Sequence, residues 1–162
     1  MLRKLTPALS ALALGAVLAV PTPAAAAQGP DLRTRINENK CADIYNFDNS
    51  NGAPLVVWDC NGRDNQKWGG ATRPWEIRSA WNGKCMTFVQ DRNTDSGWPR
   101  MFDCNGGIMQ QWIYDYSSET LCTKRKPWSC LMLPSGNTNN GHRLMVWPKH
   151  TPPDPVHRWY FH

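Results

Sequence analysis

The sequence predicts an all-β barrel built from three similar segments, and two observations support this. The first is an internal repeat with a period of about 44 residues, which occurs three times. The second is a series of short alternating segments separated by turn residues, with no sustained helical period. Three copies that fill most of the chain favour a closed, three-fold-symmetric body over an open array of repeats.

Each copy of the repeat begins at a cysteine and ends at a tryptophan. An aromatic residue lies 17 positions after the first cysteine, and the closing tryptophan lies 27, 27 or 29 positions after it. These marks are the cysteines Cys41, Cys85 and Cys130, the aromatic residues Trp58, Phe102 and Trp147, and the tryptophans Trp68, Trp112 and Trp159. The repeats are therefore expected at about residues 33–75, 76–118 and 119–162.

The N-terminal segment has the composition of a secretory signal peptide. Met1–Lys4 is basic, Leu5–Val20 is mostly apolar, and Ala25–Ala27 supplies small residues before a cleavage point. A membrane anchor is the weaker reading, because Pro7 and other residues interrupt an apolar run that falls short of a span. We expect cleavage after residue 27, secretion, no membrane span, and a single domain over residues 28–162.

The charge of the chain gives no sign of nucleic-acid binding. Loss of Arg3 and Lys4 with the signal peptide lowers the formal net charge from +5 to +3. The remaining basic residues are scattered apart from the run Lys124–Lys126, which is typical of a solvated loop tip. A nucleic-acid footprint would need a basic face, so no nucleic-acid partner is expected.

Six cysteines in an oxidising compartment predict a disulfide framework. The second cysteine lies 19 residues after the first in two of the copies, which predicts the pairs Cys41–Cys60 and Cys85–Cys104. In the third copy Lys149 occupies the position of the second cysteine. Cys130 is therefore expected to pair with Cys122.

The segment after each first cysteine alternates in the way a strand with one buried face does. The first and third positions after the cysteine are apolar in every copy, whereas the position between them varies. The apolar positions hold Ala42, Met86 and Leu131, then Ile44, Phe88 and Leu133; the variable position holds Asp43, Thr87 or Met132. Asp43 is therefore predicted to point away from the core.

The segment before each conserved aromatic residue alternates too. Val57 and its counterparts Met101 and Val146 are apolar, whereas Trp58 lies on the opposite face together with Val56. The aromatic residue should therefore point away from the core in each copy. Turn residues separate these strands, among them Asn51-Gly52, Ser96-Gly97 and Asn140-Gly141.

Three segments of the first repeat are similar to a known family of protein domains. Cys-x-Asp-Ile from Cys41 to Ile44, the segment Val57–Gly62 and the sequence Asn65–Trp68 are similar to the ricin B-chain type of lectin domain. The similarity extends over residues 33–162. The resemblance implies a β-trefoil, which has twelve strands in three pseudo-repeats around one core, here stabilised by disulfides.

The resemblance also implies where a sugar would bind. In this family an aspartate accepts hydrogen bonds from neighbouring hydroxyls, an aromatic ring stacks on the apolar face of the sugar, and an Asn-Gln pair completes the polar set. The first repeat fills these roles with Asp43, Trp58, Asn65 and Gln66, the glutamine mainly by orienting the aspartate. The expected ligand is a galactose-like or xylose-like sugar.

The other two repeats lack this polar set. The second has Thr87 in place of the aspartate and Met109 in place of the asparagine, and the third has Met132 and His157. One sugar site per chain is therefore expected. The alternative is a protein-binding or cell-binding accessory subunit with eroded sugar sites. Its docking surface would use apolar residues that look exposed from the sequence, Met132, Met145 and Trp98.

Catalysis is not expected. The sequence has no nucleophile elbow, no metal-ligand spacing and no phosphate-binding loop. Glycoside hydrolysis needs two carboxylates that flank one cleft, whereas the repeat distributes the carboxylates around a barrel. We therefore expect a non-catalytic protein without a cofactor or a metal.

Overall fold

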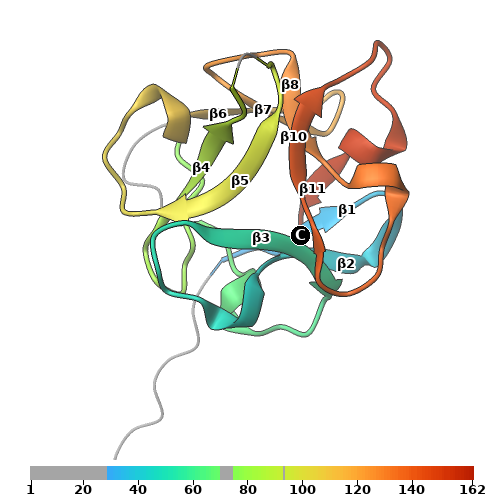
Figure 1. Ribbon diagram of the computed structural model, residues 1–162. Helices are drawn as coiled ribbons and strands as arrows, with labels where there is room; N and C mark the ends of the chain where they lie inside the picture. The colour runs from blue at the N-terminus through green and yellow to red at the C-terminus, as the bar shows by residue number, and fades with distance from the viewer. Residues whose placement is uncertain (1–28, 70–74, 93) are drawn as a thin grey trace, which may run out of the picture.

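The computed structural model describes residues 29–69, 75–92 and 94–162, so the expected signal peptide lies outside the described residues. Eleven strands are found in the described residues (Figure 1): β1 (Leu32–Thr34), β2 (Asn37–Ile44), β3 (Ala53–Asp59), β4 (Cys85–Gln90), β5 (Gly97–Phe102), β6 (Trp112–Asp115), β7 (Thr120–Thr123), β8 (Ser129–Met132), β9 (His142–Arg143), β10 (Met145–Pro148) and β11 (Trp159–Phe161). Five short 3-10 turns connect them: η1 (Tyr45–Phe47), η2 (Asp64–Gln66), η3 (Ile108–Gln110), η4 (Pro134–Gly136) and η5 (Pro155–His157). Within the described ranges no helix is long and apolar enough to cross a membrane.

Three antiparallel strand pairs form the barrel, one from each repeat: β2 with β3, β4 with β5, and β8 with β10. Adjacent pairs are joined in the same register each time. The joining partners are Ala53 with Met101, Gly97 with Val146, and His142 with Val57. Val57, Met101 and Val146 are the apolar positions that the repeat aligned, so equivalent residues close the barrel with three-fold symmetry.

The interior of the barrel contains the residues that the alternation predicted. Ala42, Ile44 and their counterparts in the other two repeats are buried, and all of them belong to one hydrophobic cluster. The closing tryptophans Trp68, Trp112 and Trp159 are at most 1% exposed and belong to the same cluster. The all-β, three-repeat prediction is therefore confirmed, with one shared core.

Two of the twelve strands of a β-trefoil are reduced to isolated bridges near the first junction between repeats. Trp68 bridges Ser79, Glu76 bridges Gln111, and Arg78 bridges Cys85. The short strand β9, beside β3, brings the described strands to eleven. The backbone thus follows the course of a twelve-stranded β-trefoil, with fewer strand hydrogen bonds at this junction.

The three disulfides join Cys41 to Cys60, Cys85 to Cys104, and Cys122 to Cys130. This is the pairing that the repeat predicts. The first two bonds connect the two strands of a hairpin at the end where the aromatic residue lies. The third links β7 to β8 and replaces the bond that Lys149 makes impossible in the third repeat.

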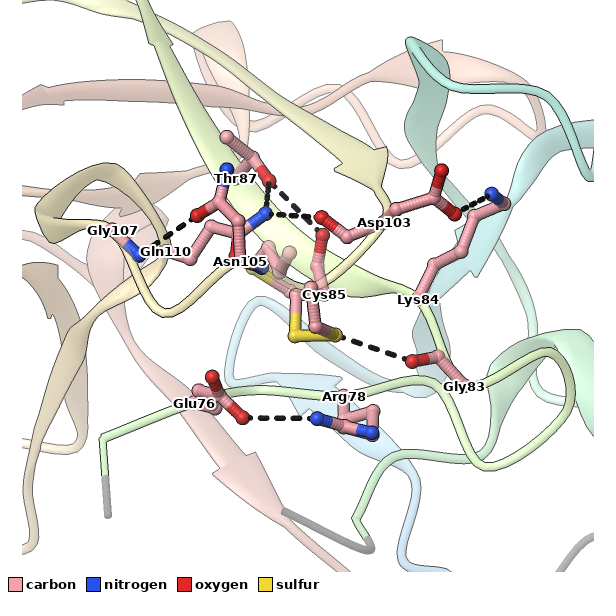
Figure 2. The surroundings of a disulfide bond; sticks show 12 residues. Glu76, Arg78, Gly83, Lys84, Cys85, Thr87, Asp103, Asn105, Gly107 and Gln110 are labelled. Carbon is pink, nitrogen blue, oxygen red and sulfur yellow. Dashed lines mark hydrogen bonds and ion pairs between the residues drawn. A yellow bond between two sulfur atoms is a disulfide. The ribbon is translucent and has the colours of Figure 1, made fainter. Parts of the chain in front are cut away.

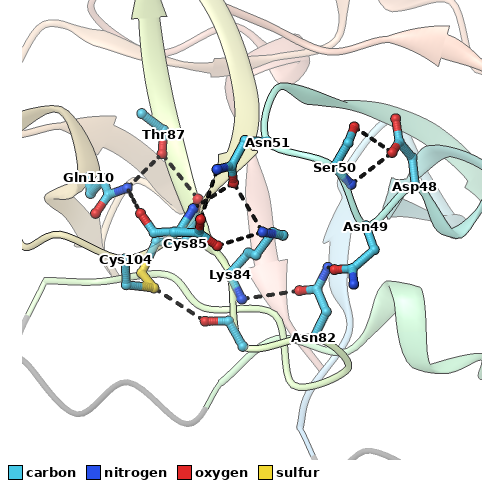
Figure 3. Close-up of polar contacts among 12 residues, drawn as sticks. Asp48, Asn49, Ser50, Asn51, Asn82, Lys84, Cys85, Thr87, Cys104 and Gln110 are labelled. Carbon is cyan, nitrogen blue, oxygen red and sulfur yellow. Dashed lines mark hydrogen bonds and ion pairs between the residues drawn. A yellow bond between two sulfur atoms is a disulfide. The ribbon is translucent and has the colours of Figure 1, made fainter.

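A polar clamp holds each of two hairpins to a loop of a neighbouring repeat. In the second repeat Lys84 donates to Asp103 at 2.6 Å and to Asn51 at 3.0 Å, and Asn51 in turn donates to Asp103 at 2.8 Å. Figure 3 shows Asn51, from the loop before β3, reaching Lys84. In the first repeat Lys40, Asp59 and Asn140 make the same arrangement. The clamp on Asp59 holds the end of β3 next to Trp58.

Candidate functional site

The first repeat places a buried carboxylate between two side-chain amides. Asp43 is only 3% exposed although it points away from the barrel core, because the η2 turn covers it. Asn65 donates from Nδ2 to Asp43 Oδ1 at 2.9 Å, and Gln66 donates from Nε2 to Asp43 Oδ2 at 2.9 Å. Each carboxylate oxygen thus has one donor and retains capacity for a second.

The backbone around the site holds the two amides in place. Gln66 also donates to the Asp59 carbonyl at 2.9 Å and accepts from the Asn61 N–H at 2.9 Å. Asn65 also donates to the Ile44 carbonyl at 3.0 Å. Both amides are therefore oriented by strand and loop backbone, so the carboxylate is held from two sides in a single geometry.

Burial raises the pKa of Asp43 to about 6. The hydrogen bonds from Gln66 and Asn65 lower it, as does the positive charge of Arg63, but these effects are smaller than the effect of burial. At neutral pH the group is an ionised acceptor, and it loses that charge in mildly acidic solution.

Asp43 forms part of the wall of a cavity of about 100 Å³ at the protein surface. The cavity is lined by Asp43, Asn46, Phe47, Trp58, Asn61, Arg63 and Asn65. Three of the four residues predicted for the site therefore lie on it. The fourth, Gln66, is fully buried behind Asp43 and contacts the carboxylate rather than the cavity.

The two aromatic rings of the cavity come from different elements. Trp58 is partly buried near the end of β3, beside Tyr45 at a ring distance of 6.3 Å and close to Gly141. Phe47 ends the η1 turn, is 37% exposed, and packs edge-on against Trp81 at 5.2 Å. The cavity thus combines an ionised acceptor, amide groups and two apolar faces.

The sequence reasoning missed Asn46, Phe47, Asn61 and Arg63. Asn46 and Phe47 both have positive φ, of 52° and 53°, which is unfavourable for a residue with a side chain. In the third repeat the equivalent of Phe47 is Gly136, with φ of 64°. A glycine at this register was the available signal that the chain turns left-handed here, and the turn places the side chain of Phe47 on the cavity wall.

The second repeat keeps the frame of the site without its charge. Gln110 donates to the Asp103 carbonyl at 3.0 Å and accepts from the Asn105 N–H at 2.8 Å, as Gln66 does in the first repeat. The same amide nitrogen of Gln110 also donates to Thr87 Oγ1 at 3.1 Å (Figure 2). The cavity here is about 580 Å³ and has Met109 and Phe102 on its wall. It is larger than the first cavity and offers no carboxylate at the position of Asp43.

The third repeat has a cavity of a different kind. His157 replaces the glutamine, is 2% exposed, and has a pKa lowered mainly by burial. A cavity of about 370 Å³ lies nearby, lined by Trp98, Pro134, Gly141, His142, Arg143 and Met145. Met132, Met145 and Trp98 were expected to be exposed, but all three are partly buried. Trp147, by contrast, is 47% exposed.

A metal centre is not indicated by the described part of the chain. In residues 29–69, 75–92 and 94–162, no group of three or more histidine, cysteine, aspartate or glutamate side chains is arranged to hold an ion. Several carboxylates outside the site instead pair with lysine or arginine. Asp59, Asp95 and Asp103 each do so, and their hydrogen bonds to lysine lower the pKa of each.

The fold and the amide-held carboxylate define a β-trefoil with one polar surface cavity in its first repeat. The chain belongs to the ricin-type β-trefoil lectin domain family, whose model matches residues 30–159. No curated protein sequence matches the chain significantly.

Solved structures share this fold at low sequence identity. The designed three-fold symmetric protein ThreeFoil is 20% identical, with a TM-score of 0.70 over 82% of this chain and 96% of that chain. The C-half of an earthworm R-type lectin in complex with GalNAc is 20% identical, with a TM-score of 0.61 over 82% and 98%. The β-trefoil lectin of the Vibrio vulnificus hemolysin/cytolysin, with N-acetyl-D-lactosamine bound, is 21% identical, with a TM-score of 0.60 over 82% and 91%. At these identities the likeness shows the fold alone.

Proposed function

We propose that the chain is a secreted, non-catalytic lectin that binds one sugar per molecule in the Asp43 cavity. The observation that carries this proposal is the state of Asn65. Its amide nitrogen is used twice, on Asp43 and Ile44, whereas its Oδ1 is buried and has no hydrogen-bond partner among the described residues. Buried acceptors are rarely left unpaired in native structures. Asn65 lies on the wall of the cavity, so a sugar hydroxyl would supply the partner after a small shift of the side chains that cover this oxygen.

The carboxylate offers a second and a third contact for the same ligand. Because Asn65 and Gln66 each take one site on Asp43, both carboxylate oxygens can accept one further hydrogen bond. Hydrogen bonds to a charged acceptor contribute about 1.5–3 kcal/mol each. Two neighbouring hydroxyls of a pyranose present donors at a spacing that suits one carboxylate.

The aromatic rings on the cavity wall would contact the apolar face of the sugar. A pyranose has an apolar face of C–H groups, which packs against a flat ring. Trp58 and Phe47 provide two such surfaces on the cavity wall. A cavity of about 100 Å³ is small, which favours a single terminal sugar over a stretch of polysaccharide.

The ligand class proposed is a galactose-like or xylose-like sugar. Two structures of the same fold have GalNAc and N-acetyl-D-lactosamine bound, and both ligands contain a galactose-type ring. Those relatives support the sugar class, while the residues of the Asp43 cavity support the location. A single shallow site should bind with a Kd of about 1 mM, or about −4 kcal/mol.

Calorimetric titration with galactose and with xylose tests the proposal, after a glycan array has screened the ligand class. We expect one sugar per chain and no measurable binding to Asp43→Asn. Asp154→Asn is the matched control, because Asp154 is an exposed aspartate of the third repeat that does not line the cavity. Two or three sugars per chain, or retained affinity in Asp43→Asn, would show that the site is misplaced.

Secretion has its own test. The N-terminal residues 1–27 have the composition of a signal peptide, so protein recovered from a culture medium should begin at Gln28. Mass spectrometry of the intact chain measures this directly. Protein found only inside the cells, with Met1 retained, would contradict the proposed secretion without affecting the sugar site.

A protein-binding accessory subunit is the second candidate, and the third repeat is the observation that favours it. The cavity of about 370 Å³ there has Trp98, Pro134 and Met145 on its wall, close to the exposed Trp147 in sequence and fold. Apolar and aromatic residues of this kind are enriched at protein interfaces. A glycan array without any bound sugar, together with co-purification of a second secreted protein that Met145→Glu abolishes, would favour this function over the lectin.

A further inference from the structure

We propose that the hairpin between β7 and β8 docks onto an anionic phospholipid surface. The hairpin tip and one neighbouring residue form a patch of two tryptophans and three basic residues, hereafter the basic tip: Trp75, Lys124, Arg125, Lys126 and Trp128. Sugar binding makes no use of it. None of the three cavities described above is lined by these residues.

The tip is held in shape by bonds at its base. The Cys122–Cys130 disulfide links the two strands of the hairpin directly below it. Thr123 Oγ1 accepts from the Lys126 N–H at 3.0 Å and donates to the Lys126 carbonyl at 3.1 Å, and the Ser129 N–H donates to the same carbonyl at 2.8 Å. The turn that carries the basic residues is therefore ordered before any partner binds.

Both tryptophans of the basic tip are half exposed. Trp75 is 51% exposed and Trp128 is 49% exposed, whereas the closing tryptophans of the repeats are buried. The indole N–H of Trp128 donates to Asp95 Oδ2 at 3.0 Å, which orients the ring and leaves its apolar surface outward. A large apolar ring held in water at this exposure is unfavourable unless a partner covers it.

A lysine lies over each ring. Lys124 Nζ is 5.3 Å from the centre of the Trp75 ring, and Lys126 Nζ is 5.3 Å from the centre of the Trp128 ring. Lys126 also forms an ion pair with Asp95 at 2.7 Å. Among the described residues no carboxylate pairs with Lys124 or with the exposed Arg125, so their charges are available to an anionic partner.

This combination is the one that membrane interfaces favour. Tryptophan rings settle at the level of the lipid headgroups, where one part of the ring is in an apolar and another in a polar environment. Lysine and arginine next to them are attracted by the phosphate groups of anionic lipids. Because the basic tip lines none of the three cavities described above, it suits a flat surface better than a compact ligand. The charge of the tip selects anionic over zwitterionic lipid.

The position of the tip would leave the sugar cavity accessible. In Figure 1 the strands β7 and β8 lie at the top of the view, whereas β3, which carries Trp58, lies in the lower half. A molecule docked through the basic tip would therefore hold strand β3 on the side away from the membrane. Sugar binding and membrane docking would be independent of each other.

The proposal is tested by co-sedimentation, which measures the fraction of purified protein that binds to vesicles. The probes are vesicles of phosphatidylcholine alone, and of phosphatidylcholine with an equal part of phosphatidylglycerol, neither of which carries a sugar ring. We expect binding to the anionic vesicles only. Neutralising one charge, in Lys124→Gln or Arg125→Gln, should weaken binding about fivefold. Trp75→Ala and Trp128→Ala should weaken it as well.

Matched variants separate the basic tip from general effects of charge and of aromatic rings. Arg143→Gln removes one exposed positive charge from strand β9, and Trp147→Ala removes a tryptophan that is 47% exposed, both outside the tip. The protein used begins at Gln28, because the basic and apolar segment 1–27 would itself bind anionic vesicles. Thermal unfolding of each variant shows whether the fold is retained.

Three outcomes would overturn the proposal. The first is no binding to anionic vesicles. The second is binding that Arg143→Gln and Trp147→Ala weaken as much as the tip variants do. The third is binding to a soluble acidic polysaccharide, lost in the tip variants, without binding to vesicles, which would assign the tip to a glycan instead. Failure of galactose to bind would leave this result unaffected, so the two proposals fail separately.

Discussion

Asn65 donates a hydrogen bond to Asp43 at 2.9 Å and so joins the η2 turn to strand β2 across 22 positions of the chain. The contact has two consequences. It buries a carboxylate that strand alternation alone would leave in solvent, and it turns the oxygen of the Asn65 amide away without a partner. The buried charge, on the wall of a cavity that also has two aromatic rings, is the feature of the first repeat that favours a ligand.

Asp43→Asn should destabilise the domain as well as abolish sugar binding. An asparagine at this position presents an NH₂ group to one of the two amide donors, so one of the present hydrogen bonds is lost. Loss of that bond destabilises, whereas removal of a buried charge offsets part of the effect. We expect a net loss of no more than about 2 kcal/mol, measured by urea unfolding. A fully unfolded variant would show that the carboxylate is essential to the fold, and the binding test would then need Trp58→Ala.

The orientation of Asp43 could be predicted from the sequence, but its burial could not. Ala42 and Ile44 on either side are apolar in every repeat, which assigns Asp43 to the opposite face of the strand. What covers that face is the η2 turn, which lies more than twenty positions further along. Alternation describes only the strand in which it occurs, so it contains no information about the turn that packs on it.

For the same reason, neither the position of Phe47 at the site nor the size of the second cavity could be predicted from strand alternation. After Ile44 the chain leaves β2 and turns through two left-handed residues, whereas β4 continues as a strand to Gln90. Loss of the carboxylate at Thr87 could be read from the sequence, and no carboxylate replaces it there. The size of the second cavity could not be predicted from the sequence, because it depends on the path of the chain after the strand rather than on the aligned positions.

Sugar affinity should fall in mildly acidic solution. Burial raises the pKa of Asp43 to about 6, so the carboxylate gains a proton, and loses acceptor capacity, as the pH falls through that value. Affinity should be constant above neutral pH and about tenfold weaker one pH unit below the pKa. Calorimetric titration with galactose at a series of pH values measures this. An affinity that does not change across this range would contradict the role of the ionised carboxylate.

The stability of the fold should respond to Asp43 in the opposite direction. The pKa of Asp43 in the folded protein lies above its unfolded value of 3.8, so the folded state binds the proton more tightly. The stability that this group contributes is therefore present at low pH and is lost as the pH rises through about 6. His157 acts the other way, since burial lowers its pKa. The difference between the stability profiles of wild type and Asp43→Asn isolates the aspartate.

Phe47→Gly should separate ligand binding from stability. The residue has a φ of 53°, where a side chain costs about 1 kcal/mol or more and a glycine costs nothing. The substitution removes this strain, but it also removes the edge-on contact with Trp81, worth about 0.5–1.5 kcal/mol. We expect unfolding free energy to change by no more than about 1 kcal/mol and sugar affinity to fall about three- to tenfold. Phe47→Tyr keeps the ring and should bind as the wild type does; equal affinity in Phe47→Gly would remove Phe47 from the site.

The closing tryptophans offer a test of how evenly the three repeats are stabilised. Trp112 donates its indole N–H to the Met86 carbonyl at 2.8 Å, whereas the indole N–H of Trp159 is buried without a partner among the described residues. Replacement by phenylalanine removes the same atoms from two equally buried sites. Trp112→Phe also leaves a carbonyl without its donor, whereas Trp159→Phe removes an unsatisfied polar group. Trp112→Phe should therefore be the more destabilising by about 1–3 kcal/mol, measured as the difference in urea unfolding free energy at equal m-values. Equal losses would mean that Trp159 has a hydrogen-bond partner in solution, such as a buried water molecule, and that the third repeat is as well satisfied as the second.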